Sequence, residues 1–327
     1  MKLRSCLIVA ILLSLAMPAR GQFFQKLDDW FRQQQEKQPY DTTYIYRPQE
    51  RWLVRTRSRI NGESLRLVVG ADNGTSYGAA VSNGGEFYQS IGAGYRKLAR
   101  NVQFHPFGQK TSFGYDINVY GNRIGFNHNA AISYGMTGVA IEGSELTDIP
   151  ANGIICLNAS ASAYYAFNGK RFSMPAAINQ NFVQRKSAGS ILATMQAQAF
   201  SLGFPNAASS GIPVQDISVA IFGLGGGYGY NWVPSERWLI HLSLTETIGF
   251  LKSSWLTFNG AETLRHPGGP PVFMTRGHAA VLYYFGKWYT GITVDADDLL
   301  CLSGDDTMGY YLGRMNSNAF LSLGVRF

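Results

Sequence analysis

Hydrophobic and polar residues alternate through most of this chain, and the alternation is clearest between residues 112 and 134. A period of two residues predicts β-strands whose successive side chains lie on opposite faces. Gly121-Asn122 interrupts the pattern, and we interpret this pair as a tight turn between two antiparallel strands. Such a two-residue turn would pair Tyr120 with Arg123, Asn118 with Gly125 and Asp116 with Asn127. The hairpin would then have one apolar face and one polar face.

The same period recurs as far as the last residue and predicts about twelve strands from residue 64 onward. These strands cover 64–69, 86–95, 98–104, 112–120, 124–134, 153–165, 191–199, 217–232, 238–245, 276–284, 288–296 and 318–327. Residues 51–60 form a candidate for one more strand. Barrels with both termini on one side of a membrane need an even number of strands. We therefore predict an all-β fold, a closed antiparallel transmembrane β-barrel of about twelve strands, within roughly ten to fourteen.

Residues 51–60 place three arginines, Arg55, Arg57 and Arg59, on one face of the candidate strand. An arginine that faces lipid near the middle of a bilayer costs about 2 to 4 kcal/mol. These side chains are therefore expected to face water, the lumen of the barrel or a partner.

The first 21 residues are typical of a cleavable signal peptide. Lys2 and Arg4 precede an apolar run from Leu7 to Met17, and small residues stand before the cleavage site that we predict at Gln22. No later stretch has the roughly 18 uninterrupted apolar residues that a spanning helix requires. The sequence thus predicts export to the outer membrane, with a periplasmic segment at 22–50 and a barrel at 51–327.

Residues 22–50 begin with a predicted amphipathic helix, because Phe23, Leu27, Trp30 and Phe31 fall on one helical face. This helix could lie on the membrane, enter the lumen or bind another protein. Together with the arginine face it motivates a periplasmic partner that contacts residues 22–60.

The connections between strands fall into two classes. Residues 121–122, 233–236 and 285–287 are short and are predicted to be periplasmic turns, whereas four longer segments are predicted to be extracellular: 135–152, 203–215, 251–275 and 298–315. Residues 171–186 fit neither class, and the pattern allows either a strand or an excursion into the periplasm or the lumen.

Composition supports a barrel and argues against several other classes. The chain has 37 glycines, 20 phenylalanines and 18 tyrosines, and only 15% of its residues are charged, as expected for many strands and tight turns. The net charge of +7 falls to +4 once Lys2, Arg4 and Arg20 leave with the leader, and no basic cluster indicates nucleic-acid binding. No Cys/His spacing indicates a metal, and we expect no cofactor. Cys156 and Cys301 could form a disulfide or remain two thiols.

Aromatic residues near the ends of the predicted strands suggest girdles at the two membrane interfaces: Trp52, Tyr95, Tyr134, Tyr165, Trp232, Trp238, Tyr284 and Trp288. The last strand ends on Phe327, an assembly signal by which the barrel-insertion machinery would take up the chain.

Several passages resemble an uncharacterised, domain-of-unknown-function family of outer-membrane β-barrel proteins from Bacteroides-type bacteria. They are Tyr40-Asp41-Thr42-Thr43-Tyr44, Lys110 to Phe126, Lys186-Ser187-Ala188-Gly189-Ser190, Gly227-Tyr228-Gly229-Tyr230 and the closing strand. The resemblance extends from about Tyr40 to Phe327 and implies an outer-membrane barrel. It implies no catalytic residue.

The sequence leaves three functions open. The first is a narrow polar pore with these lumen-lining candidates: Arg66, Asp116, Asn118, Arg123, Asn127, Asn129, Asn158, Gln196, Gln198, His241, Lys287 and Asp295. The second is a closed structural or partner-binding barrel, in which such groups pair with one another, as Asp116 and Arg123 would. The third is a lipid-modifying enzyme, for which His128 on the lipid-facing set is the candidate; Tyr115 would lie opposite it, with no serine or carboxylate on that face. Nor does Gly189-Ser190 have the Gly-x-Ser-x-Gly pattern of a nucleophile elbow.

Overall fold

A computed structural model describes most of the chain after residue 39. The described residues are 29, 40–48, 50, 52–71, 76–95, 98–104, 112–142, 145–150, 154–205, 214–258, 263–267, 271–304 and 308–327. The predicted leader at 1–21 and the helix-forming residues Phe23, Leu27, Trp30 and Phe31 lie outside this part. Within the described part, none of the helices has the length and hydropathy of a membrane-crossing helix.

The fold is all-β, as predicted, and almost every strand belongs to one large sheet. The strands of that sheet are β2 (Trp52–Ala71), β3 (Ser76–Ser82), β4 (Glu86–Tyr95), β5 (Leu98–Phe104), β6 (Ser112–Tyr120), β7 (Ile124–Tyr134), β8 (Thr137–Glu142), β9 (Glu145–Ile149), β10 (Ile155–Ala166), β12 (Ala188–Gly203), β13 (Val214–Ser235), β14 (Trp238–Phe258), β15 (Thr263–Pro267), β16 (Val272–Phe285), β17 (Trp288–Gly304) and β18 (Met308–Arg326). The remaining described elements are β1 (Ile45–Tyr46), β11 (Val183–Gln184) and the short helix α3 (Met174–Ile178).

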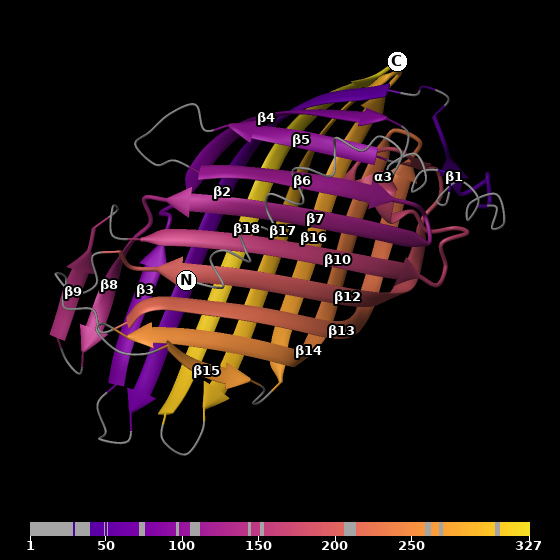
Figure 1. The fold of residues 1–327 in the computed structure, drawn as a ribbon. Coiled ribbons are helices and arrows are strands. Elements are labelled where there is room, and N and C mark those ends of the chain that lie inside the picture. Colours follow the sequence, from indigo (N-terminus) through magenta and orange to yellow (C-terminus); the bar gives the residue numbers. More distant parts are fainter. Residues whose placement is uncertain are drawn as a thin grey trace.

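The pairing of the strands leads around the sheet and back to its start. Each strand is antiparallel to its neighbour in the order β2, β4, β5, β6, β7, β10, β12, β13, β14, β16, β17, β18, and β18 pairs with β2 from Arg326 opposite Leu53 to Met308 opposite Ala71. Figure 1 shows the result as two curved layers, with β4 to β14 crossing in front of β16 to β18 and β2. The sheet therefore curls around an interior, which we call the lumen.

The two ends of the lumen are built differently. At one end, which we call the turn end, tight connections join β6 to β7, β13 to β14 and β16 to β17, and Tyr95 of β4 pairs with Leu98 of β5. Trp52 exchanges two backbone hydrogen bonds with Phe327 at this end. The C-terminus, α3 and β1 lie together at this end (Figure 1). At the opposite, distal end, β3 pairs with the second half of β2, the hairpin of β8 and β9 continues the sheet from β3, and β15 pairs with β14.

Several strands are longer than the sequence predicts. Residues 51–60 and 64–69 belong to one strand, β2, and the expected loops at 251–275 and 298–315 are largely strand. The expected loop at 135–152 contains the hairpin of β8 and β9. The sheet thus continues through polar and glycine-rich stretches at the distal end, for which the sequence pattern predicts loops.

The hairpin of β6 and β7 has a register two residues away from the predicted one. Tyr120 pairs with Gly125, Asn118 with Asn127 and Asp116 with Asn129, since the turn runs from Gly121 to Ile124 and the amide of Gly121 donates to the carbonyl of Ile124. Asn122 in this turn is buried and accepts a hydrogen bond from the hydroxyl of Ser173, 2.8 Å away. The longer turn is therefore held by a segment remote in sequence. A shift by two residues keeps every side chain on its predicted face.

Along the middle of the barrel wall, side chains alternate between a polar inner face and an apolar outer face. On β14, Leu242 and Leu244 are 66% and 60% exposed on the outside, whereas His241 and Ser243 are buried on the inside. Of the predicted aromatic girdle, Tyr134 and four tryptophans, Trp52, Trp232, Trp238 and Trp288, are exposed on the wall, and Tyr165 is partly buried. Tyr284 is buried instead and donates to the carbonyl of Ala176 inside the lumen, and the Tyr95 side chain lies outside the described part.

Candidate functional site

Residues 167–187, which connect β10 to β12, fold into the lumen at the turn end, and we call them the plug. They contain α3 and β11, and β11 pairs with β1 in a separate two-stranded sheet. The side chains of Phe172, Ala176, Ala177 and Phe182 are at most 1% exposed, because they pack against apolar residues of the inner wall such as Leu239 and Leu282. The segment that the sequence could not assign is therefore a lumenal excursion.

Polar groups of the wall hold the plug from several sides. Arg55 donates to the side-chain oxygen of Gln180 over 3.2 Å, and Arg326 donates to the backbone carbonyl of Gln180 over 2.8 Å. Arg57 donates to the carbonyl of Ile178 over 3.2 Å. The arginine face of residues 51–60 thus lies in the lumen, one of the three settings that the sequence allowed. Charge-assisted hydrogen bonds of this kind contribute roughly 1.5 to 3 kcal/mol each.

Gln180 is also the one described residue other than glycine with a positive φ, of 57°. A left-handed conformation costs such a residue about 1 to 3 kcal/mol and persists only where its surroundings dictate it. Here the backbone amide and side chain of Gln180 donate to the carbonyls of Pro175 and Ala177, in addition to the two arginine contacts. The plug is therefore held in one conformation by contacts with the wall.

The distal end of the lumen is filled by an apolar cluster. Its members come mainly from β2, β3, β8, β9, β10, β12, β13, β14, β16, β17 and β18. They include Leu65, Phe200, Leu202, Ile217 and Leu312, all at most 1% exposed. Cys156 and Cys301 belong to this cluster as buried thiols that are not bonded to each other. This end of the lumen resembles the core of a soluble domain.

Between the plug and the apolar cluster lies a polar cavity of about 300 Å³, which we call the chamber. Seven of the predicted lumen residues line it: Asn118, Asn127, Asn129, Asn158, Gln196, Gln198 and Asp295. Arg57, Arg59, Arg276 and Arg314 bring positive charge to its wall, and Glu63, Asp295 and Asp297 bring negative charge. The chamber is therefore polar and close to neutral.

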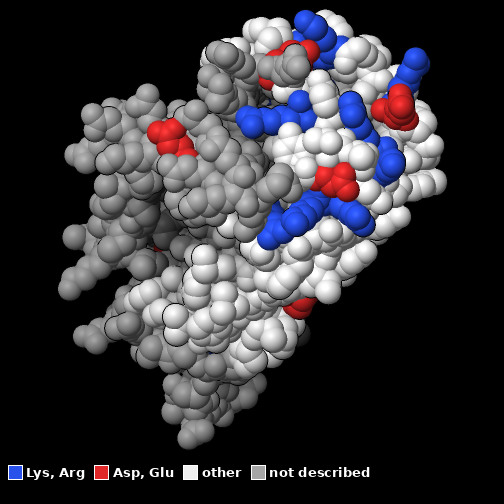
Figure 2. Space-filling view, turned by 90° about the vertical axis from the view of Figure 1, so that its right-hand side faces the viewer, with Lys and Arg blue, Asp and Glu red and all other residues white. Residues whose placement is uncertain are grey.

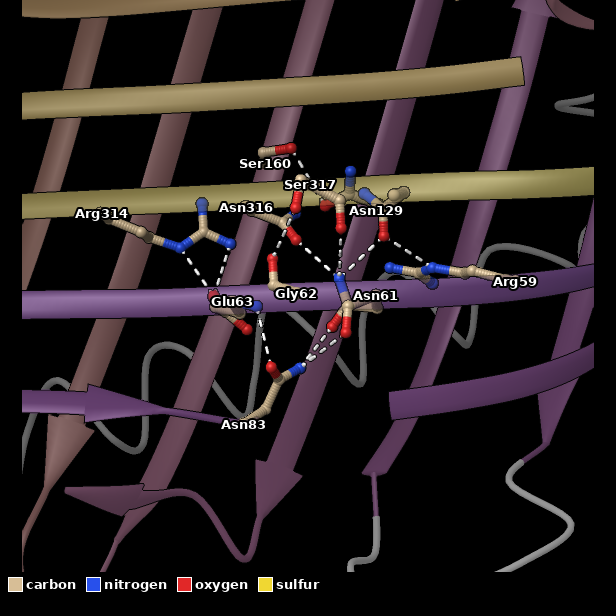
Figure 3. A network of polar contacts seen from close by, with 11 residues as sticks. Arg59, Asn61, Gly62, Glu63, Asn83, Asn129, Ser160, Arg314, Asn316 and Ser317 are labelled. Carbon is tan, nitrogen blue, oxygen red and sulfur yellow. Dashed lines mark hydrogen bonds and ion pairs between the residues drawn. The ribbon is translucent and has the colours of Figure 1, made fainter. Parts of the chain in front are cut away.

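An extended network of hydrogen bonds covers the side of the chamber formed by β2 and β18 (Figure 3). Arg314 forms a two-pronged ion pair with Glu63, with nitrogen–oxygen distances of 2.8 and 2.7 Å. Asn61 donates to Asn316 and accepts from Asn83, each over 2.7 Å, and the side chain of Asn83 in turn accepts from the backbone amide of Glu63. This network lies at the border between the chamber and the apolar cluster, where buried charge needs such partners.

Two further ionic contacts lie on the side formed by β16 and β17. Arg276 contacts Asp297 over 2.5 Å and donates to the hydroxyl of Ser162 over 2.8 Å. His278 binds Asp295 through Nδ1, while its Nε2 atom is buried and has no hydrogen-bond partner among the described residues. Charges of the chamber wall are thus largely paired with one another, as the closed-barrel alternative supposed.

Five predicted lumen residues have other surroundings. Arg66 is exposed on the outer face of β2, because the alternation runs unbroken through that strand and places Leu65 and Leu67 inside. Lys287 is exposed on the turn after β16, and Arg123 lies in the β6–β7 turn, where it donates to the hydroxyl of Tyr165. His241 is buried beside the plug, with its ring 6.1 Å from that of Phe172. The side chain of Asp116 lies outside the described part.

His128 faces outward, as predicted, and its two ring nitrogens are occupied. One lies 3.0 Å from the hydroxyl of Tyr115 and the other 3.0 Å from the carbonyl of Ser160. Ile117, rather than Tyr115, is directly opposite it in the observed register. These neighbours provide neither a nucleophile nor a carboxylate. Among the described residues there is also no group of three or more His, Cys, Asp or Glu side chains that could hold a metal ion.

Sequence reasoning missed several residues of the chamber, including Ser243, Arg276, Asp297 and Arg314. Arg276 and Ser243 stand on predicted strands, and their alternation with outward residues such as Leu242 could have identified them. Arg314 falls in the predicted loop 298–315, and Asp297 falls between that loop and the predicted strand 288–296, so the pattern predicts no face for either residue.

Basic side chains gather on the outer surface at the turn end (Figure 2). The exposed ones include Lys170, Arg171, Arg185 and Lys186 at the two ends of the plug, together with Arg237 and Lys287 on neighbouring turns. The guanidinium of Arg171 lies 5.0 Å from the ring centre of Tyr44, and that of Arg185 lies 4.6 Å from that of Tyr46. We call this surface the basic face; it covers the outer side of the plug.

Comparison with solved structures yields low-scoring matches. The outer membrane protease OmpT from Escherichia coli has a TM-score of 0.40 and 8% identity, over 86% of this chain and 97% of its own. The toluene transporter TodX from P. putida has a TM-score of 0.29 and 9% identity, over 86% and 91% of the two chains. The outer membrane protein OprG from Pseudomonas aeruginosa has a TM-score of 0.30 and 11% identity, over 88% of this chain and 99% of its own.

No curated protein matches the sequence. A family model does match, over residues 39–327, and it includes every strand of the large sheet. The chain belongs to the family described as "Domain of unknown function (DUF4421)".

Proposed function

We propose that this protein is an integral outer-membrane protein whose twelve-stranded barrel, the circuit from β2 to β18, is a gated conduit for small polar solutes. Three features support the proposal: the circuit of paired strands, the apolar outer wall with tryptophans at the turn end, and the polar inner wall. A closed barrel satisfies all backbone groups in lipid, and its outer face is expected to be apolar with aromatic girdles.

The position of the chamber supports gating, because it lies between the plug at the turn end and the apolar cluster at the distal end. We call the plug and the apolar cluster the two seals of the chamber. A wall lined by arginine, asparagine and carboxylate side chains provides a path for polar solutes, but the plug blocks it at the turn end. Many bonds between the plug and the wall are hydrogen bonds, which water can replace when the plug moves. We therefore propose that the resting barrel is closed, that displacement of residues 171–186 opens the chamber at the turn end, and that rearrangement of the apolar side chains at the distal end completes the path.

Single-channel conductance in planar bilayers tests this proposal. The refolded wild-type protein should be silent, whereas a variant in which residues 171–186 are replaced by a Gly/Ser linker of equal length should give discrete steps. Arg57→Ala in that variant should shift its ion selectivity toward cations, because Arg57 lines the chamber. Arg66→Ala is the matched control: it removes an arginine from the outer face of the same strand and should leave selectivity unchanged.

Two outcomes would contradict the proposal. Steady wild-type conductance that the linker leaves unchanged would show that the plug is not a gate. Silence of the linker variant, once a heat-modifiability assay shows that it is folded, would show that the apolar cluster closes the lumen by itself.

A second candidate function, binding of a periplasmic partner, is favoured by the basic face. Four of its cations lie at the ends of the plug, so an acidic protein bound there would contact the gate directly. Replacing Lys170, Arg171, Arg185 and Lys186 by Gln should abolish salt-sensitive retention of the protein on an acidic peptide column. Equal retention of this variant and the wild type would contradict the idea.

A further inference from the structure

Three side chains beside the plug form a chain of hydrogen bonds with the order of a catalytic triad. The hydroxyl of Ser243 lies 3.0 Å from Nε2 of His241, and Nδ1 of His241 lies 2.6 Å from Oδ1 of Asn231. The strands dictate this arrangement, because Asn231 pairs directly with His241 across β13 and β14, and Ser243 is the next inward residue on β14. All three residues are at least 96% buried.

The surroundings of Asn231 determine which atoms donate. Its amide nitrogen donates to the carbonyl of Ser173 and to the side-chain oxygen of Gln184, both 2.9 Å away in the plug. Its amide oxygen is therefore the acceptor that faces His241, so the imidazole proton resides on Nδ1. Nε2 of His241 is then the acceptor for the hydroxyl of Ser243. A serine that donates to a histidine, itself oriented by a third group, is the arrangement of an activated nucleophile.

We propose that Ser243 and His241 are the catalytic residues of an acyl-transfer site that hydrolyses small carboxylic esters in the chamber, with Asn231 as a positioning residue. Ser243 lines the chamber, whereas His241 and Asn231 lie behind it against the plug. A cavity of about 300 Å³ is at the lower limit for small-molecule sites and restricts the substrate to a short acyl ester.

The reaction balances with water as the only co-reactant. The Ser243 oxygen bonds to the carbonyl carbon while His241 takes the hydroxyl proton at Nε2, and this proton passes to the departing alkoxide as the ester C–O bond breaks. Water then attacks the acyl-serine and gives its proton to His241, which returns it to the Ser243 oxygen as the acyl bond breaks. The products are a carboxylic acid and an alcohol.

A second feature of the chamber indicates the alcohol part of the ester. His278 lies directly opposite Ser243, and Asp295 lies directly opposite His278, on three adjacent strands. Nδ1 of His278 binds Asp295, and its buried Nε2 has no partner among the described residues. With the proton on Nδ1, this Nε2 atom accepts a hydrogen bond, which a free hydroxyl of the substrate would supply. Monoesters of small polyols have both groups.

Labelling with diisopropyl fluorophosphate tests the site without a known substrate. This reagent forms a phosphorus–oxygen bond with an activated serine and releases fluoride, and mass spectrometry of peptides identifies the serine. We expect an adduct on Ser243 in the folded wild-type protein and none in Ser243→Ala. His241→Gly should lower the labelling rate about 100-fold or more, as expected when a general base is lost. Added imidazole should restore labelling of this variant, which a merely structural role of His241 would not predict.

Asn231→Leu should also slow the labelling, because His241 loses the group that orients it. Ser218→Ala is the matched control, since Ser218 is a buried serine outside the chamber lining that donates to Ser201 and Asp216 rather than to a histidine. This variant should be labelled at the wild-type rate. With glycerol monoacetate as substrate, Ser243→Ala should lower kcat/KM by a similar factor of about 100 or more, while Ser218→Ala should have no effect.

Entry of the ester requires the plug to move, and in this respect the inference rests on the proposed function. Access is measured separately through Ser162→Cys, which places a thiol on the chamber wall for reaction with methyl methanethiosulfonate. Modification of that thiol without an adduct on Ser243 would overturn the catalytic proposal and leave the gate intact. A thiol at residue 162 that never reacts in the folded protein would also overturn the catalytic proposal, because no ester could reach Ser243. The conductance of the linker variant would then still test the proposed function by itself.

Discussion

The two seals of the chamber close the same lumen by opposite means. The distal seal consists of apolar side chains from the strands themselves, such as Phe200 and Leu202, and has the packing of a domain core. The plug consists of a separate segment, of which Gln180 and Ser173 exchange hydrogen bonds with the wall in addition to its apolar contacts. A seal formed by side chains of the strands opens only when those side chains rearrange within the wall, whereas a segment that crosses the mouth can move as a unit. The plug is therefore the better candidate for a gate.

The largest expected effect is at the distal seal. Phe200→Ala removes a ring that is completely buried in the apolar cluster, so we expect the free energy of unfolding to fall by about 3 to 5 kcal/mol. Urea titration of the protein in lipid vesicles, followed by tryptophan fluorescence, measures this change. Phe167→Ala, whose ring is 60% exposed, is the control and should cost less than about 1 kcal/mol. Equal losses for the two variants would mean that the cluster is not a packed core.

The next effect concerns the ion pair at the border of the chamber. Glu63→Leu leaves the guanidinium of Arg314 buried without its carboxylate, and removing one member of a buried pair costs about 3 kcal/mol or more. The double variant Glu63→Leu, Arg314→Leu should recover much of this loss, since it leaves no unpaired charge. The same urea titration measures both. If the double variant is less stable than the single one, the network of Figure 3 contributes more than the pair alone.

A smaller and more local effect is expected at the plug. Arg326→Met removes the hydrogen bond to the carbonyl of Gln180 and the stacking of the guanidinium 5.4 Å from the ring centre of Tyr284. Loss of a charge-assisted hydrogen bond worth about 1.5 kcal/mol should speed amide exchange in residues 172–184 about tenfold. Exchange in the distal half of β12 should not change. Uniform acceleration along the chain would show that the plug and the barrel unfold together.

The comparison between the two seals also explains what the sequence could predict. Alternation identified the strands and placed Asn127, Gln196 and Asp295 on the inner wall, because side chains follow the period of the backbone. Alternation also predicts that Arg66 lines the lumen, if apolar residues face lipid along the whole strand. At the distal end the apolar residues of the strands face inward instead. Periodicity says which residues share a face and not which face is inside.

The remaining errors have a tertiary origin. The turn after Tyr120 is longer than its sequence suggests, and Asn122 in that turn contacts Ser173 in the plug. Residues 171–186 have no period because their partners lie on many strands. The hydrogen-bonded group of Ser243, His241 and Asn231 combines residues of two strands, and only the register of β13 and β14 shows that Asn231 lies opposite His241.

The smallest effect is expected at the outer edge of the plug and depends on pH. The carboxylate of Asp41 accepts hydrogen bonds from the hydroxyl and backbone amide of Thr43, which, with nearby Arg171, lower the pKa of Asp41 below its usual value of 3.8. A group whose pKa is lower in the folded state stabilises that state above the unfolded pKa, and this contribution disappears as the pH falls through the folded value. Amide exchange at residues 41–45 should therefore be slow at neutral pH and accelerate below pH 3.8, with exchange rates corrected for their intrinsic dependence on pH. Asp41→Asn should remove this acid-dependent step while leaving exchange in β12 unchanged. If the variant retains the step, another group controls the attachment of this segment to the plug.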